Sequence, residues 1–182
     1  MLIAAYLSVM HKMDRLDFDD DWPAPREYLY EVGRMTTVWG SLESAVNLSI
    51  GKLAGYNINR DYRAAILVAH SNFQQRIDII GALCEQLVPE YPELSGYQSV
   101  VKKIEAAQKG RNKFAHNALT LNEETGVVQV SHLSARGALK TKVEVVRVND
   151  IKEVSAKIHE AMCALLSLIS GDELLPMWER NA

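Results

Sequence analysis

The sequence predicts a mainly α fold: an antiparallel four-helix bundle with a small β-meander inserted between the third and fourth long helices. Four stretches repeat apolar residues at steps of three or four, which is the period of an amphipathic helix. After His116 the pattern changes to alternation with many β-branched residues, which indicates strands. Helices that each have one apolar face bury it best against one another, so a bundle is the expected arrangement.

The first helix is expected from Arg26 to about Ala54. Its apolar stripe consists of Leu29, Val32, Met35, Trp39, Leu42, Val46, Ile50 and Leu53. Gly55 follows, a residue type that commonly ends helices. Upstream, an acidic patch leads into Trp22-Pro23-Ala24-Pro25, which cannot sit inside a helix. Residues 1–25 are therefore expected to form an N-terminal arm.

The second and third helices are predicted from the next two stripes. The second stripe contains Tyr62, Ile66, Phe73, Ile77, Ile80, Leu83 and Leu87. Pro89 and Pro92 end it, because proline cannot continue a helix. The third helix is expected over 95–116, and its stripe contains Tyr97, Val101, Ile104, Ala107 and Phe114.

Three strands are predicted after the third helix, at 119–121, 127–133 and 141–148. Segments 122–126 and 134–137 have turn composition and separate the strands.

The last helix is expected to start at a capping box made by Asp150 and Glu153 and to end before Gly171. These boundaries predict one helical domain over 26–172 and a C-terminal tail over 173–182.

Charge is unevenly distributed along the chain. The formal net charge of −3 speaks against a protein that coats nucleic acid. Residues 100–147, however, contain nine Lys or Arg and four Asp or Glu, so this segment is positively charged. A solvated basic surface and a phosphate-binding surface both fit this pattern.

The cysteine and histidine positions predict neither a disulfide framework nor a metal site. Cys84 and Cys163 are well separated, and His11, His132 and His159 show no metal-ligand spacing with each other or with the cysteines. No glycine-rich phosphate loop or dinucleotide fingerprint is present, so no cofactor is expected.

No targeting or membrane segment is expected either. Residues 1–10 are apolar but lack a basic leader and a cleavage site, and the uncharged run 161–171 is too short to cross a bilayer. These features favour a cytoplasmic protein and no membrane partner.

The strongest functional signal is the sequence from Arg111 to His116 at the end of the third helix. Asn112 and His116 are four residues apart on one helical face, so the Asn112 amide is expected to hydrogen-bond the imidazole and fix its tautomer. Arg111 can swing toward the same imidazole. A permanent cation beside the side chain that titrates near neutrality suits chemistry on a phosphodiester.

A helical bundle whose third long helix ends in Arg-Asn-x3-His resembles the HEPN superfamily. The hallmark of that superfamily is an Arg followed by a His after a short spacer, commonly with Asn directly after the Arg, as at Arg111, Asn112 and His116. The run Trp39-Gly40-Ser41-Leu42-Glu43 is similar to the pattern in the first helix of these bundles. The resemblance covers about residues 26–170, and the inserted strands depart from the barest form of the bundle.

The resemblance implies a metal-independent endoribonuclease that acts on RNA as a homodimer, with two motifs facing each other across one cleft. It also implies a toxin or defence effector, for which an antitoxin or a nucleotidyltransferase is a possible partner. His116 would take the 2′-hydroxyl proton or protonate the leaving oxygen, and Arg111 would hold the charge on phosphorus. Asn112 would position them. The products would be a 2′,3′-cyclic phosphate and a 5′-hydroxyl.

Three further residues are candidates for supporting roles. Glu43 lies beside the stripe of the first helix, where it could orient Arg111 or His116 or pair with another arginine. Lys109 and Lys113 border the motif and could bind flanking phosphates of RNA, although lysines near a helix C-terminus are also favoured by the helix dipole.

Two other interpretations fit the same residues. In one, the fold is catalytically silent and serves as a dimeric binding module for a nucleotidyltransferase or another enzyme. In the other, the chain is a helical scaffold in which Arg111 pairs with a carboxylate and His116 satisfies terminal helix carbonyls.

Overall fold

The computed structural model describes residues 19–57, 61–134 and 137–180. This part of the chain is mainly helical and contains a three-stranded antiparallel sheet. Its elements in chain order are α2 (Arg26–Leu53), α3 (Arg63–Val68), α4 (Phe73–Leu87), the 3-10 helix η1 (Pro92–Gly96), α5 (Tyr97–Ala115), β1 (Ala118–Asn122), β2 (Val127–Ser134), β3 (Lys140–Val145) and α6 (Val148–Ser170).

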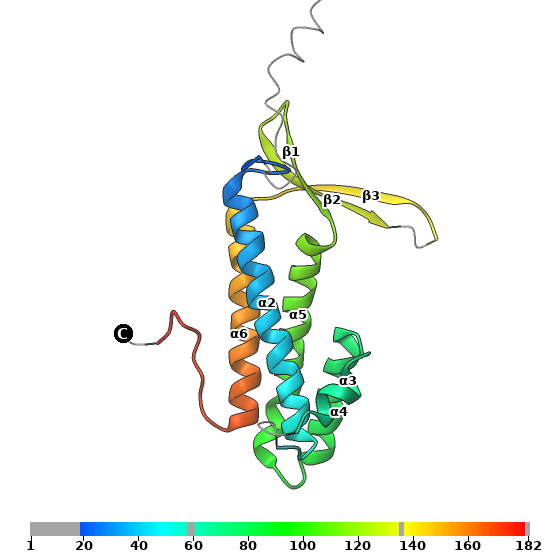
Figure 1. Ribbon diagram of the computed structural model, residues 1–182, viewed down its shortest axis with the longest axis vertical. Helices are drawn as coiled ribbons and strands as arrows, with labels where there is room; N and C mark the ends of the chain where they lie inside the picture. Colours follow the sequence, from blue (N-terminus) through cyan, green and yellow to red (C-terminus); the bar gives the residue numbers. More distant parts are fainter. Residues whose placement is uncertain (1–18, 58–60, 135–136, 181–182) are drawn as a thin grey trace, which may run out of the picture.

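The long helices α2, α5 and α6 lie side by side, with the sheet at one end of the molecule and α3 and α4 toward the other (Figure 1). Helix α6 packs against both α2 and α5, and α4 packs against α2. Helices α2 and α6 both run away from the sheet, whereas α5 runs toward it. The expected antiparallel order therefore holds for α5 and its neighbours, but α4 and α6 both run in the same direction as α2. The sheet returns the chain to the end where α2 begins before α6 starts, and the segment through α3 returns it to the level of Trp39 before α4 starts.

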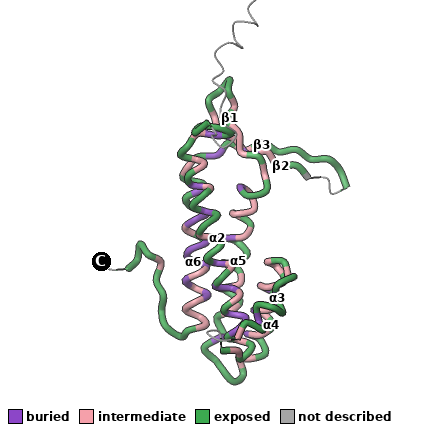
Figure 2. Tube along the Cα trace, in the orientation of Figure 1, coloured by how far each residue is buried: buried purple, intermediate pink, exposed green. Residues whose placement is uncertain are grey.

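The core lies between the helices and reaches Val128 and Val130 of β2, whereas β3 is largely exposed (Figure 2). The stripe predicted for α2 supplies a large part of this core: Met35, Leu42 and Val46 are fully buried and Trp39 is 3% exposed. Ile104 of α5 and Ile158 of α6 are fully buried in the same cluster. The predicted limits of the first helix are confirmed to within one residue at its C-terminal end.

The predicted second helix is wrong as one continuous helix, because the structure divides it into α3 and α4. The Asn72 side chain accepts a hydrogen bond from the Gln75 backbone N–H (2.9 Å), and the Gln75 side chain accepts one from the Asn72 N–H (2.8 Å). This reciprocal cap starts a new helix at Phe73. The spacing of apolar residues continues across the break, so the sequence period alone does not reveal it.

The predicted β-meander is confirmed, with strand order β1-β2-β3. The third strand is shorter than expected because α6 already begins at Val148. Asp150 is the third residue of that helix and accepts a hydrogen bond from the Arg147 backbone N–H (2.8 Å). The predicted helix start at Asp150 was thus late by most of a turn.

The two terminal segments contact the body where they are described. Residues 1–18 of the expected N-terminal arm lie outside the described residues; beyond them, the Pro23 carbonyl accepts a hydrogen bond from the Leu121 N–H of β1 (3.3 Å) and Ala24 is fully buried. In the tail, the Met177 N–H donates to Nε2 of His159 on α6 (3.1 Å), and burial lowers the pKa of that histidine. Of the helices in the described ranges, none has the length and apolar character that crossing a membrane requires.

Candidate functional site

The Arg-Asn-x3-His motif lies where α5 ends and the chain turns toward the sheet. His116 caps the helix with non-helical angles (φ −119°, ψ 5°). Asn117 then stabilises the end, because its side-chain amide donates to the Lys113 carbonyl (2.9 Å) and to the Asn112 carbonyl (3.4 Å). Carbonyls at a helix C-terminus lack partners within the helix, so these bonds fix the shape of the last turn. This role of Asn117 was not predicted from the sequence.

Arg111 and His116 contact each other directly. Nη1 of Arg111 lies 3.0 Å from Nε2 of His116 and 3.2 Å from Oδ1 of Asn112. A guanidinium can only donate hydrogen bonds, so Nε2 is the acceptor and a neutral His116 carries its proton on Nδ1. The imidazole is exposed and Arg111 is partly buried. The Arg111 guanidinium and the His116 imidazole, which the sequence predicted as the reactive groups, thus lie together at the surface.

The expected hydrogen bond from the Asn112 amide to the imidazole of His116 is wrong. The Asn112 side chain accepts from Arg111 instead, and it is the Asn112 backbone carbonyl that meets the His116 backbone N–H (3.4 Å). The reason is the helix end: His116 has left the helical conformation, so the spacing of four no longer places the two side chains on one face. Asn112 therefore positions the guanidinium rather than the imidazole.

The guanidinium of Arg111 rests against the aromatic core. Its Cζ lies 5.2 Å from the ring centroid of Trp39, which in turn packs on Phe73 with a centroid distance of 4.4 Å. A cation over an indole face is held by the negative charge of the ring surface. Nε of Arg111 is buried and has no hydrogen-bond partner within the described chain. Trp39 was predicted only as a core residue.

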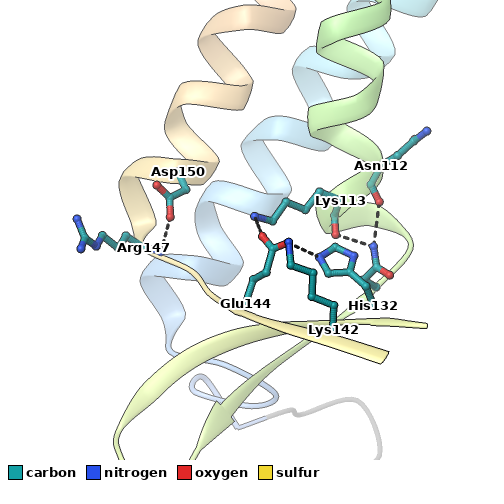
Figure 3. A network of polar contacts seen from close by, with 8 residues as sticks. Asn112, Lys113, His132, Lys142, Glu144, Arg147 and Asp150 are labelled. Atoms are coloured by element: carbon teal, nitrogen blue, oxygen red, sulfur yellow. Dashed lines mark hydrogen bonds and ion pairs between the residues drawn. The ribbon is translucent and has the colours of Figure 1, made fainter. Parts of the chain in front are cut away.

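Lys113 is bound to the sheet (Figure 3). Its ammonium lies 2.6 Å from one carboxylate oxygen of Glu144 on β3, and Lys142 lies 2.6 Å from the other. His132 on β2 is 3.8 Å from the same carboxylate. Hydrogen bonds from Lys113 and then Lys142 lower the pKa of Glu144 to about 2. Lys113 is therefore engaged in an ion pair, and its contact with RNA stays a prediction.

Glu43 and Lys109 are not part of this contact network. Glu43 is partly buried one turn after Trp39 on α2 and makes no hydrogen bond or ion pair with the described residues. The structure therefore does not bring it to Arg111 or His116, which it was expected to orient. Lys109 is exposed on α5, which leaves its charge available to a ligand.

The motif does not line either of the two hollows that are described next. Two hollows, of about 550 and 400 Å³, are lined by other residues, the first by the ends of α2 and α6 with the segment around Tyr91, and the second by the start of α2 with Val148 and Lys152. Among the described residues, no three His, Cys, Asp or Glu side chains converge in a way that could hold a metal ion.

Comparisons of the chain with family models, with curated proteins and with solved structures find no match.

Proposed function

We propose that this chain is a HEPN-like, metal-independent endoribonuclease in which Arg111 and His116 carry out the chemistry. The observation that carries the proposal is the 3.0 Å contact between Nη1 of Arg111 and Nε2 of an exposed His116. The helices α2, α4, α5 and α6 and the position of the motif at the end of α5 support an HEPN-like four-helix arrangement, with α2 and α6 parallel.

The contact suggests how substrate prepares the base. In the free protein, Nη1 of Arg111 donates a hydrogen bond to Nε2 of His116, so the lone pair of that nitrogen cannot accept another proton. A phosphodiester competes for the guanidinium, because a planar fork binds phosphate oxygens in a bidentate fashion. Nε2 is then free to accept the proton of the neighbouring 2′-hydroxyl.

The reaction that follows is an internal transfer on phosphorus. The 2′-oxygen attacks the phosphorus, the bond to the 5′-oxygen breaks, and the leaving oxygen takes a proton from a second, protonated imidazole. Arg111 stabilises the additional negative charge on the phosphoryl oxygens. The products are a 2′,3′-cyclic phosphate and a 5′-hydroxyl, so no water or metal enters this step.

A homodimer supplies the second imidazole. One imidazole cannot be base and acid in the same step, and symmetric dimers place two copies of a residue about one axis. His116 is exposed in the single chain, so a second copy can reach it.

A catalytically silent binding module is the second candidate. The observation that favours it is the ion pair between Lys113 and Glu144, which neutralises one of the basic groups beside the motif. A binding module would leave RNA intact under every buffer condition.

The test is RNA cleavage with purified protein and a chelator present, followed on a labelled oligonucleotide. His116→Ala is expected to lower the rate by about 10² to 10⁴-fold, since it removes the acid–base group. Arg111→Lys keeps the charge but loses the bidentate contact, and is expected to lower the rate by roughly tenfold or more.

His70→Ala is the matched control, because His70 is an exposed histidine between α3 and α4. Its cleavage rate should equal that of the wild type. Equal rates for the wild type and His116→Ala would refute the assignment, and intact RNA in all samples would favour the binding module.

A further inference from the structure

Strand β3 has an outer edge with no partner strand in the described part of the chain. It is the last strand in the order β1-β2-β3, and its ladder to β2 extends from Lys140 to Val145. The hairpin of β2 and β3 projects from the helical body (Figure 1). A two-stranded hairpin is only marginally stable by itself, and an unpaired edge offers its backbone groups to another strand.

The two faces of this hairpin differ in chemistry. Glu144, Lys142 and His132 lie on the face that turns toward Lys113 and the helices. The opposite face contains a row of exposed apolar side chains: Val143 is 53%, Val145 64% and Leu133 71% exposed. Valines of this kind are favoured in strands that pack against further strands and are unfavourable in water.

The charges of β3 select one way for the strand to pair with a copy of itself. In an antiparallel pair about a two-fold axis perpendicular to the sheet, one residue lies opposite its own copy. An axis at Glu144 sets Glu144 opposite its own copy, and an axis at Thr141 sets Lys140 opposite Lys142. An axis at Lys142 sets Lys140 opposite Glu144 on both sides, but at the cost of Lys142 opposite its own copy. An axis at Val143 instead sets Lys142 of each copy opposite Glu144 of the other, which is favourable on both sides.

We propose that β3 pairs with β3 of a second copy of this chain, with Val143 opposite Val143, to form a continuous six-stranded antiparallel sheet. The two Lys142–Glu144 cross-strand pairs fix the register. The apolar rows of the two copies then join into one surface, with Val145 beside Thr141 of the other strand.

This arrangement has a consequence for the motif. Because the axis is perpendicular to the sheet, both helical bodies lie on the same side of it, as do both Lys113–Glu144 pairs. The ends of the two α5 helices therefore approach each other. The pairing itself does not depend on the proposed ribonuclease activity, and the experiments below measure mass and cross-linking, not cleavage.

The first experiment measures molecular mass by sedimentation for the full-length protein. The wild type should be a dimer, and Lys142→Glu and Glu144→Lys alone should each weaken self-association on the order of tenfold or more, since each replaces two attractive pairs by two repulsive ones. An equal mixture of the two variants should restore the dimer, because the strand with two acidic side chains in one variant then faces the strand with two basic side chains in the other.

Lys140→Glu is the control, because residue 140 lies opposite Val146 in this register. Its dimer should be unchanged. Recovery in the mixture also shows that both variants are folded. A monomeric wild type at the highest attainable concentration, or a dimer that neither single variant weakens, would overturn the proposal.

The second experiment reads the register by disulfide trapping. Val143→Cys should form a covalent dimer under mild oxidation, because residue 143 meets its own copy. Val145→Cys should not, since the two copies of residue 145 are separated by about four strand positions, on the order of 13 Å. The native Cys84 and Cys163 are buried, which keeps the background low. Efficient trapping at 145 but not at 143 would contradict the register.

Discussion

Arg111 meets three different kinds of group within a few ångströms. Its Nη1 contacts a carboxamide oxygen and an imidazole nitrogen, and its plane rests over the Trp39 indole. Nε is left without a partner in the described chain. A buried donor without a partner is costly. The guanidinium is therefore held by Asn112 and Trp39, and its Nη1 borders the exposed imidazole of His116.

Glu144 is one carboxylate at which the stability of the protein depends on pH. Its pKa is about 2 when folded, held down by Lys113 and Lys142, against an ordinary value of 4.5. A lowered pKa means that the stabilisation is fully present above pH 4.5 and is lost as the pH falls toward 2. Glu144→Gln should therefore lower the melting temperature at pH 7, and the gap to the wild type should close by about pH 2.

Thermal unfolding measured at pH 7, 4, 3 and 2 tests this prediction. Glu153→Gln is the control, because Glu153 is an exposed carboxylate paired with Lys157 on the surface of α6. A gap for Glu144→Gln that stays constant from pH 7 to pH 2 would show that the two lysines do not stabilise the folded protein through the Glu144 charge.

Sequence spacing predicted the meeting of Arg111 with His116 but not its details. A helical spacing of four suggested a bond between Asn112 and His116, yet the helix ends one residue too early for that geometry. The pairing of Lys113 with Glu144 spans 31 residues and depends on how the sheet folds back, so no local pattern could reveal it.

At the scale of elements, Gly110 sets the distance between the end of α5 and α6. A Cβ added at this position would lie 3.1 and 3.3 Å from the two methyl carbons of Val154. Val154 is 9% exposed, and its branched side chain has little freedom to rotate away. The glycine thus permits the close packing that positions Arg111, its neighbour in sequence.

Gly110→Ala is expected to destabilise the protein by about 1 kcal/mol. A gain in helix propensity of about 1 kcal/mol opposes an overpacking cost of about 1–3 kcal/mol. Denaturant unfolding measures the change. Gly110→Ala combined with Val154→Ala should be less destabilised than the sum of the two single variants, because the smaller side chain makes room for the new methyl group. Strict additivity would indicate that the two positions do not interact.

Helical periodicity located α2, α5 and α6 well, since their stripes are long and face one core. It missed the break before α4 because Asn72 and Gln75 act through side-chain caps, while the apolar residues on either side keep the same phase. The strand limits were predicted from alternation, but Val146 and Val148 continue that alternation past the end of β3.

At the scale of the whole molecule, the motif lies between the helical body and a projecting sheet (Figure 1). The sequence predicted both parts and their order, since the change of period at His116 marks the boundary between them. The relative direction of α2 and α6 and the projection of the hairpin were not predicted. Both follow from how the sheet connects α5 to α6, which is a long-range property with no signature in a single stretch.

The most direct test of the ribonuclease assignment is the mass of the RNA ends produced by the wild-type protein with a chelator present. Attack by the 2′-oxygen predicts fragments that carry a 2′,3′-cyclic phosphate at one end and a 5′-hydroxyl at the other, and these fragments should disappear with His116→Ala. Fragments with a 3′-hydroxyl and a 5′-phosphate, or RNA that remains intact, would contradict the roles given to Arg111 and His116.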